Sequence, residues 1–240
     1  MRMMNLARAA AAVALTAGVA QAQLAGTLNF SGTVVARSAT LPGGGLDPVN
    51  VVLDFSPTGM GFGGITISDD GNTGDFSIFN VAFPTPSFQG IIQDITVGDG
   101  GNYNVPNFVT VPLSNQFQFN LLTIAAGSFS SASCFVPAVA GQTCTPAGNT
   151  GPTVFNLSNA QNGTGIDATV SFSVAGTVNG PAGKTGNFTG TFSAQFPGMS
   201  YQDLLTTINT PGGSLKRSFS ATFVVTSSTV PEPATLALMG

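Results

Sequence analysis

The stretch FTGTFSAQF at residues 188–196 alternates strictly between apolar or small side chains and polar ones. A period of two is that of a β-strand with one buried face, because successive side chains point to opposite sides of a sheet. Residues 168–174 alternate in the same way, and the GPAG segment at residues 180–183 supplies a turn between the two. The two segments are therefore predicted to pair as an antiparallel hairpin.

The same alternation recurs along the chain, at residues 49–55, 117–121 and 215–225. The 240 residues include 31 Gly and 15 Pro, a composition that favours many short strands joined by tight turns. We predict that residues 23–226 form a single all-β domain, an antiparallel two-sheet sandwich or jelly roll. A β-solenoid is the alternative, but it needs a regular repeat, and no fixed period is visible.

Four further segments are predicted as strands from their content of Phe, Ile and Val. Residues 76–83 and 91–97 are two of them, separated by a Pro-Thr-Pro segment. Residues 105–113 contain two prolines, which cannot donate to a sheet ladder, so this strand is expected at a sheet edge. Residues 128–136 are predicted as a strand that leads into the segment between the two cysteines.

One helix is predicted, at residues 201–208. Ser200 can act as its N-cap, and Asp203 stands three residues later, which is close to a capping box. Two leucines and an isoleucine share one face of the helix and can pack on a sheet. A Pro-Gly-Gly segment then ends it. We expect this helix to be a short cover on the β-domain.

The charge content is low and slightly acidic. Lys and Arg number 6 and Asp and Glu number 10, for a formal net charge of −4, and charged residues make up only 7% of the chain. So few cations cannot form the basic surface that a phosphate backbone requires, and we expect no nucleic-acid partner. Hydrophobic residues reach 42%, which excludes an intrinsically disordered chain.

The side chains that most enzymes use are scarce. No histidine occurs, which excludes Ser-His-Asp and Cys-His catalysis and histidine metal sites. The only glutamate is Glu232, so the two carboxylates of a glycosidase would have to come from the aspartates. Asp47, Asp69, Asp70 and Asp99 stand in turn-like segments, where aspartate usually hydrogen-bonds the local backbone. We therefore expect no enzymatic activity.

Two cysteines, Cys134 and Cys144, lie ten positions apart on either side of a segment with Pro and Gly. A single even pair in an exported protein most simply forms one disulfide. A metal pair is the alternative, but no histidine and no further cysteine is present to complete a site. We predict the disulfide.

The densest group of oxygen ligands is formed by Asp69, Asp70, Asn72 and Asp75. Calcium takes about six to eight oxygens, so a calcium loop is one interpretation. Gly74 falls where the EF-hand order requires a side-chain ligand, which makes a plain turn the preferred interpretation. Apart from calcium at this loop, no cofactor is expected.

The sequence shows no clear aromatic platform for sugars. There is no Trp, there are two Tyr, and the 19 Phe mostly follow the strand alternation that places them in the core. Tyr103, in a Gly-Asn-Tyr-Asn turn, is the aromatic residue best suited to meet a sugar ring. Bridging calcium at the Asp69 to Asp75 loop could compensate for the missing tryptophans.

The N-terminal residues 1–22 have the three parts of a secretory signal peptide. Two arginines precede an apolar run at residues 9–19, and Ala20 and Ala22 form an A-x-A cleavage box. Cleavage there would make Gln23 the first residue of the mature protein. We therefore predict export.

The C-terminal residues 227–240 begin with a Ser/Thr-rich spacer, continue through Val230, Pro231, Glu232 and Pro233, and end in an apolar run. The prolines make this segment a stiff spacer in any case. It also resembles the start of a PEP-CTERM sorting signal, the tag that exosortases read in Gram-negative bacteria. In that family a transmembrane helix and a short Arg-rich tail follow. Both are missing from this chain. Its apolar run is far shorter than the roughly 20 residues of a membrane span, and no arginine follows that run.

The resemblance implies particular partners and a location. The secretion machinery and an exosortase would process the chain, and it would reach the cell envelope, the cell surface or an extracellular polysaccharide matrix. We therefore expect an exported, non-catalytic surface or matrix protein. A glycan-binding, lectin-like sandwich, assisted by calcium, is the alternative function.

Overall fold

A computed structural model describes residues 23–41, 45–55, 61–80, 89–112 and 117–227. The predicted signal peptide with Ala20 and Ala22, and the Val230 to Pro233 motif, lie outside these residues. The described strands are β1 Gly26–Thr40, β2 Leu46–Phe55, β3 Phe62–Ile67, β4 Gln89–Gln93, β5 Ile95–Val97, β6 Gly101–Val111, β7 Phe117–Ile124, β8 Thr143–Cys144, β9 Asn156–Asn162, β10 Gly165–Asn179, β11 Thr185–Phe196 and β12 Ser214–Thr226. The helices are η1 Gly74–Phe79, η2 Ser131–Ser133, η3 Pro181–Gly183 (all 3-10) and α1 Tyr201–Ile208.

Eight of the strands close into one antiparallel barrel. Their order is β11-β12-β1-β3-β4-β6-β7-β10, and β10 pairs back with β11. Every pairing in this ring is antiparallel. The prediction of an all-β antiparallel domain is confirmed, but the expected division into two sheets is not found, and the pairing does not fit a solenoid. A closed sheet and a sandwich both bury one face of each strand, so the alternation of apolar residues is the same in either architecture.

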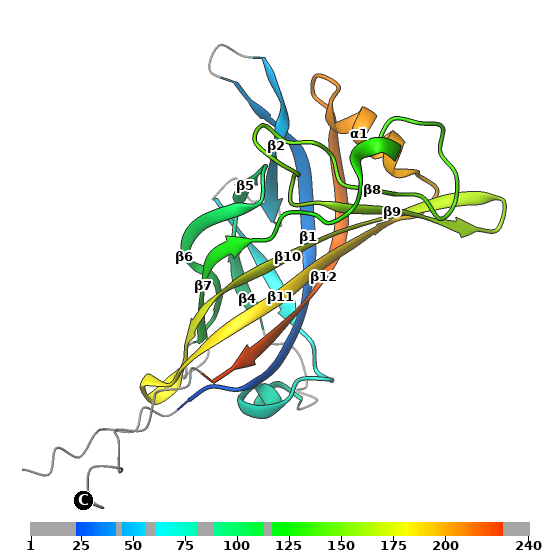
Figure 1. Cartoon of the computed structure of the whole chain (residues 1–240). Helices are drawn as coiled ribbons and strands as arrows, with labels where there is room; N and C mark the ends of the chain where they lie inside the picture. The colour runs from blue at the N-terminus through cyan, green and yellow to red at the C-terminus, as the bar shows by residue number, and fades with distance from the viewer. Residues whose placement is uncertain (1–22, 42–44, 56–60, 81–88, 113–116, 228–240) are drawn as a thin grey trace, which may run out of the picture.

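The barrel flares at one end, because two of its strands change partner along their length. β1 pairs with β3 over residues 30–32 and with β2 beyond residue 34. β10 pairs with β7 over residues 174–179 and with β9 over residues 165–171. The strands β2 and β5 on one side, and β9 and β8 on the other, therefore extend the sheet as two wings at the top of Figure 1.

Phenylalanine rings fill the middle of the barrel. Phe223 stacks on Phe188 with 4.7 Å between the ring centroids and meets Phe30 edge-on at 4.9 Å. Gly190 pairs with Phe223 across two strands, and a Cβ built on this glycine would overlap the Phe223 ring. The strand positions without a side chain therefore provide the space in which the rings pack.

The 3-10 helix η1 covers the narrow end of the barrel. Phe76 and Phe79 are fully buried in it, and Phe76 lies 5.0 Å from Phe117 between ring centroids. The predicted strand at 76–83 is therefore wrong over its described part. Phe76 and Phe79 are three residues apart, so one helical turn brings both rings to the same face, whereas a strand would separate them.

Three other strand predictions need correction. The segment 91–97 splits at Asp94 into β4 and β5, which pair with different strands. The proline-containing segment is not an edge strand: β6 pairs with both β4 and β7, and its ladder shifts register on either side of Val105. Asn104 and Asn107 adopt positive φ there, which lets the irregular backbone accommodate Pro106. Residues 128–136 form loop and the short η2 rather than a strand.

The hairpin of β10 and β11 is confirmed, with Phe172 opposite Phe192. The helix α1 is also confirmed at Tyr201–Ile208, with the Ser200 and Asp203 capping box complete. None of the helices in the described part of the chain combines the length and the hydropathy needed to cross a membrane.

Candidate functional site

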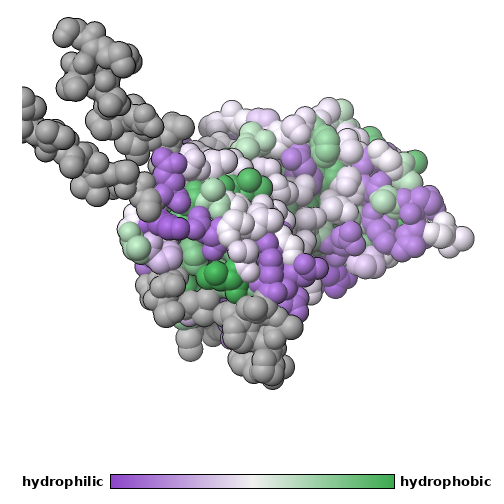
Figure 2. All heavy atoms as spheres, turned by 90° about the horizontal axis from the view of Figure 1, so that it is seen from below, coloured by the Kyte–Doolittle hydropathy of each residue, from purple (hydrophilic) through white to green (hydrophobic). Residues whose placement is uncertain are grey.

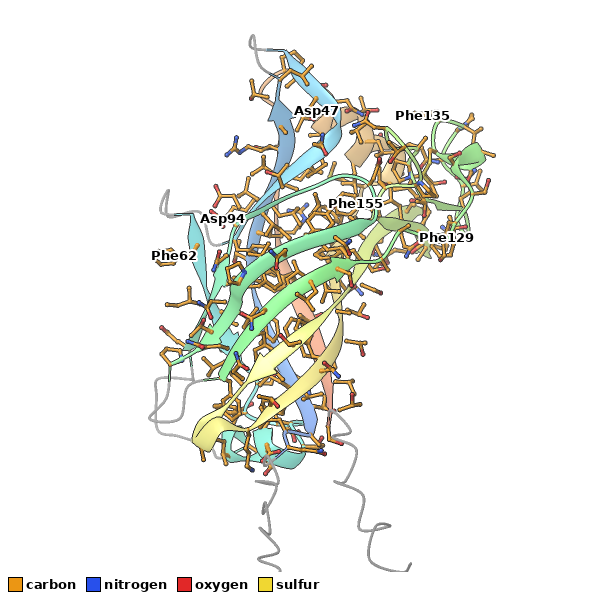
Figure 3. All side chains as sticks on the ribbon, turned by 60° about the vertical axis from the view of Figure 1, so that its left-hand side comes forward. Asp47, Phe62, Asp94, Phe129, Phe135 and Phe155 are labelled. Carbon is orange, nitrogen blue, oxygen red and sulfur yellow. A yellow bond between two sulfur atoms is a disulfide. The ribbon has the colours of Figure 1, made fainter. Side chains whose placement is uncertain are left out.

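An apolar cavity of about 120 Å³ lies at the flared end of the barrel, lined by β1, β2, β10, β11, the starts of β9 and β12, the loop that precedes β9, and α1. The lining side chains are almost all aliphatic or aromatic, and we refer to this space as the flared-end cavity. Phe155, labelled in Figure 3, comes from the loop before β9 and contributes to its wall.

The cavity exists because the inward-facing side chains become smaller toward this end. On β1 the inward series passes from Phe30 to Val34 and Ala36, and on β11 the small Ala194 stands between the lining rings Phe192 and Phe196. Phe30 and Phe192 are buried, whereas Val34, Ala36 and Ala194 remain partly exposed although they face inward. Replacing rings by small side chains on facing strands leaves a volume that the protein itself does not fill.

The floor of the cavity is aromatic. Phe172 and Phe192 stack in parallel with 4.9 Å between ring centroids, and Phe55 meets Phe219 edge-on at 5.3 Å. All four rings are at most 7% exposed. Contacts of this kind fix the rings against one another, so the floor is preformed.

The helix α1 forms the lid, with Leu204, Leu205 and Ile208 toward the cavity. Its N-terminal end is held by Tyr201, whose backbone N–H donates to Asn159 Oδ1 at 2.9 Å and whose hydroxyl donates to the Ser133 carbonyl at 3.0 Å. At the other end, Ser38 Oγ donates to the Ile208 carbonyl at 2.8 Å. The lid is therefore tied both to β1 and to the loop that carries the disulfide.

The polar groups on the wall are few. Among the described lining residues only Thr153, Ser193 and Asn209 have polar side chains, and none has an ionisable one. The Thr153 hydroxyl is buried and has no hydrogen-bond partner among the groups that the structure describes. Without a carboxylate, amine or thiol on its wall, the cavity offers no proton donor or acceptor for acid–base catalysis, but it can hold an apolar group.

The flared-end cavity has a volume of about 120 Å³ and is open to solvent rather than sealed inside the core. Natural interiors are otherwise packed with few voids. The flared-end cavity is thus a departure from the dense aromatic packing that the same strands show lower in the barrel.

The predicted disulfide is present. Cys134 and Cys144 are bonded, with 5.2 Å between their Cα atoms, and both are fully buried. They pack in one apolar cluster with Tyr201 and Leu204. The disulfide therefore supports the loop on which the N-terminal end of α1 rests. Phe135, next to the first cysteine, is 81% exposed and projects from this loop in Figure 3.

The predicted oxygen-rich loop is a turn that secures β1. Asn72 is buried, accepts from the Asn29 N–H at 2.7 Å and donates to the Ser68 carbonyl. Asp75 accepts from the Ala25 N–H and forms an ion pair with Lys184 at 2.6 Å.

The other two oxygen ligands of this loop lie on its surface. Asp69 and Asp70 are exposed, and Asp70 accepts from the Gly71 N–H. The four candidate ligands therefore do not converge on one point. In the part of the chain that the structure describes, no three His, Cys, Asp or Glu residues are grouped for a metal ion.

Tyr103 is not an exposed aromatic platform. It is half-buried, its hydroxyl donates to the Asp99 carbonyl at 2.8 Å, and it accepts from the Gly98 N–H at 3.1 Å. Burial raises the pKa of Tyr103 above its ordinary value. Tyr103 therefore links β6 by hydrogen bonds to the turn before it, and it does not present an exposed ring surface to sugars.

Two aspartates have structural roles that the sequence indicated only in part. Asp99, expected in a turn, accepts from the backbone N–H groups of Asn149 and Thr150 and from the Thr150 hydroxyl. Asp94, which the sequence did not single out, accepts from the Phe55 N–H at 2.7 Å. Burial raises the pKa of Asp94, and the neighbouring Asp54 adds to this rise. Both carboxylates are committed to holding backbone.

Sequence reasoning also missed the flared-end cavity. A partial signal for it was present, because Val34, Ala36 and Ala194 are small residues at inward positions of strands that otherwise carry phenylalanine. Comparisons with protein-family models, with curated proteins and with solved structures found no match to this chain. The assignment of function therefore rests on the residues and their geometry.

Proposed function

We propose that this chain is an exported, non-catalytic protein of the cell surface or extracellular matrix of a Gram-negative bacterium. The observation that carries the proposal is the buried bond between Cys134 and Cys144. Disulfides form and persist in oxidising compartments outside the cytosol. The signal-peptide pattern of residues 1–22 agrees with this location.

The character of the surface supports the same proposal. The face in Figure 2 is largely pale, with purple areas and few large green ones, because most of its residues are close to neutral in hydropathy or polar. Charged residues make up 7% of the chain. Hydration of this molecule therefore depends on uncharged Ser, Thr, Asn and Gln side chains. Because these side chains carry no charge, salt changes their hydration little.

The role of the aspartates supports a non-catalytic function. Asp47, Asp75, Asp94 and Asp99 all accept hydrogen bonds from backbone N–H groups, so these four acidic side chains hold the backbone of strands and turns. Glycan binding at Tyr103 loses its main support, because that ring is half-buried and its hydroxyl is engaged.

Sorting by an exosortase completes the proposal. It rests on the resemblance of Val230, Pro231, Glu232 and Pro233 to the PEP-CTERM signal. The exosortase and the secretion machinery would be the partners, and extracellular polysaccharide would be the surrounding matrix.

The test is to follow the full-length gene product in cells with and without an exosortase. We expect an oxidised protein outside the inner membrane, with a C-terminus shortened only when the exosortase is present. Replacing Pro231, Glu232 and Pro233 together by Ala should abolish the shortening, and replacing Ser227, Ser228 and Thr229 by Ala is the matched control. A cytoplasmic protein with free thiols and an unchanged C-terminal mass would contradict the proposal.

A further inference from the structure

We propose that the flared-end cavity binds a small uncharged apolar group, either an aromatic ring or a short alkyl chain. This inference concerns a ligand, so it stands independently of how the protein is sorted. It rests on the geometry of the cavity wall, on its polarity and on its size.

The strands that form the cavity wall leave an unfilled space between them. Val34 and Ala36 on β1, Val170 on β10 and Ala194 on β11 face the cavity and stay partly exposed. The same strands carry buried phenylalanines further down the barrel. The strands therefore continue past the packed core without filling the space between them, and the helical lid covers this space rather than occupying it.

The second argument is the chemistry of the wall. A water molecule in a cavity needs about two to four polar partners, and the wall supplies three polar side chains at most, one of them on the exposed Asn209. Water beside this largely apolar wall makes few hydrogen bonds to it, and an apolar guest that displaces this water gains contacts with the wall. No cationic side chain is among the described lining residues. Arg217 lies beside them, stacked on the lining ring of Phe196 at 5.4 Å from its centroid, so an anionic group inside the cavity would contact apolar side chains rather than this guanidinium. These features select an uncharged guest.

The third argument is the size of the cavity. A volume of about 120 Å³ is close to the roughly 150 Å³ of an engineered apolar cavity that accepts benzene or xenon. One aromatic ring or a short alkyl chain fits this space. The buried Thr153 hydroxyl without a partner leaves room for at most one hydrogen-bonding group on the guest.

Access to the flared-end cavity lies at the edge of the helical lid. Leu205 and Ile208 of the lid are themselves only partly buried, so the cavity reaches the surface beside α1. The C-terminal end of α1 is attached to β1 through the bond from Ser38 to the Ile208 carbonyl. A guest can therefore enter at the edge of the lid near β1 and β2 without separating the disulfide loop from the domain.

The experiment is a titration of the purified, oxidised mature protein with toluene and with n-hexane, followed by methyl resonances in ¹H–¹³C NMR. We expect saturable shifts at Val170, Leu204, Leu205 and Ile208 with at least one of the two probes, and none at distant methyls such as those of Val109. Benzoate, which carries a charge on a ring of the same size, should cause no saturable shift. Binding of toluene alone identifies an aromatic guest, and binding of n-hexane alone identifies an alkyl guest.

The discriminating variant is Ala194→Phe, which places a ring in the cavity. It should weaken probe binding about tenfold or more. Gln195→Phe adds the same ring on the outward face of the same strand and should leave the dissociation constant unchanged. If Ala194→Phe does not fold, Leu205→Trp fills the cavity from the lid and should weaken binding in the same way. No saturable shift with either probe, or equal affinity in the folded cavity-filling variant, would overturn the proposal.

Discussion

At the scale of single residues, glycine and phenylalanine decide how the barrel is filled. Phe223 lies across from Gly190, and Phe188 lies across from Gly176. In both pairs a Cβ on the glycine would meet the ring of its partner. Space for the ring is therefore the reason for glycine at position 190, whereas at Gly176 a Cβ would also meet the Asn120 backbone carbonyl of the neighbouring strand.

The first prediction follows from this packing. Gly190→Ala should lower the free energy of unfolding by about 1–3 kcal/mol, the usual loss when a methyl group is forced into a filled core. Urea denaturation at neutral pH measures it. Gly64→Ala is the matched control, because Gly64 is also a strand glycine and its Cβ would have nothing within 4 Å. Equal stability of the two variants would show that the rings do not depend on the glycine.

The second prediction concerns pH. Hydrogen bonds from the Thr150 hydroxyl and then from its N–H lower the pKa of Asp99 below the ordinary 3.8. A carboxylate with a depressed pKa stabilises the folded state at pH values above its unfolded pKa, and this stabilisation is lost as pH falls through the folded value. Asp99→Asn should therefore be less stable than the wild type at pH 7, and the difference should shrink below about pH 4.

Thermal denaturation of both proteins between pH 7 and pH 3 checks this prediction. A difference in melting temperature that stays constant over the whole range would mean that the charge of Asp99 does not matter. Thr206→Ala is a useful control, since the Thr206 hydroxyl donates within α1, far from any carboxylate of this turn.

At the scale of elements, the lid and the disulfide loop form one structural unit. Tyr201 of α1 bonds both to Asn159 of β9 and to Ser133 beside the first cysteine. The Gln202 amide also donates to Gln142, within the disulfide loop. The helix thus depends on a loop that the disulfide restricts, which explains why so short a helix is stable.

The third prediction is that replacing Cys134 and Cys144 together by Ala destabilises the protein by about 2–3 kcal/mol, the amount that a short closed loop contributes. Guanidinium denaturation measures the loss. The wild type in excess reductant should fall to the stability of the double variant, and the reductant should not affect the variant. Full stability of the double variant would show that the loop is held by its other contacts alone.

The elements differ in how far the sequence predicts them. The hairpin of β10 and β11 follows from alternation, and α1 follows from its capping residues, because both signals are local. The helix η1 was not predicted, since the Phe, Ile and Val content of residues 76–83 is typical of a strand and two rings three residues apart are too few to establish a helical period. The interior position of β6 was not predicted either. Pro106 cannot donate a hydrogen bond to the sheet, and the sequence alone does not show that positive φ at Asn104 and Asn107 accommodates it between two partner strands.

At the scale of the whole molecule, closure of the sheet removes the edges that a sandwich would leave. The ring ends on no free strand, and the outermost strands of the two wings, β5 and β8, are only three and two residues long. Short edge strands limit pairing between copies. Closure depends on β10 meeting both β7 and β11, contacts that alternation along one strand does not specify.

The molecule as a whole also divides along its length into a filled half and an open half. Rings occupy the barrel down to η1, where Phe76 lies against Phe117. Small side chains and the lid enclose the flared-end cavity at the other end. The small residue Ala194 between Phe192 and Phe196 is visible in the sequence, but it does not show that the small residues of β1 face the same space.

The most direct test of the closed barrel with an apolar cavity is a crystal structure of the oxidised mature protein under xenon pressure. Xenon occupies dry apolar cavities of this size. We predict a closed eight-stranded sheet with a xenon atom between the Phe172 and Phe192 floor and the Leu205 lid, and no xenon there in Ala194→Phe. A water-filled or collapsed space at this position, or two separate sheets in place of the ring, would contradict the account.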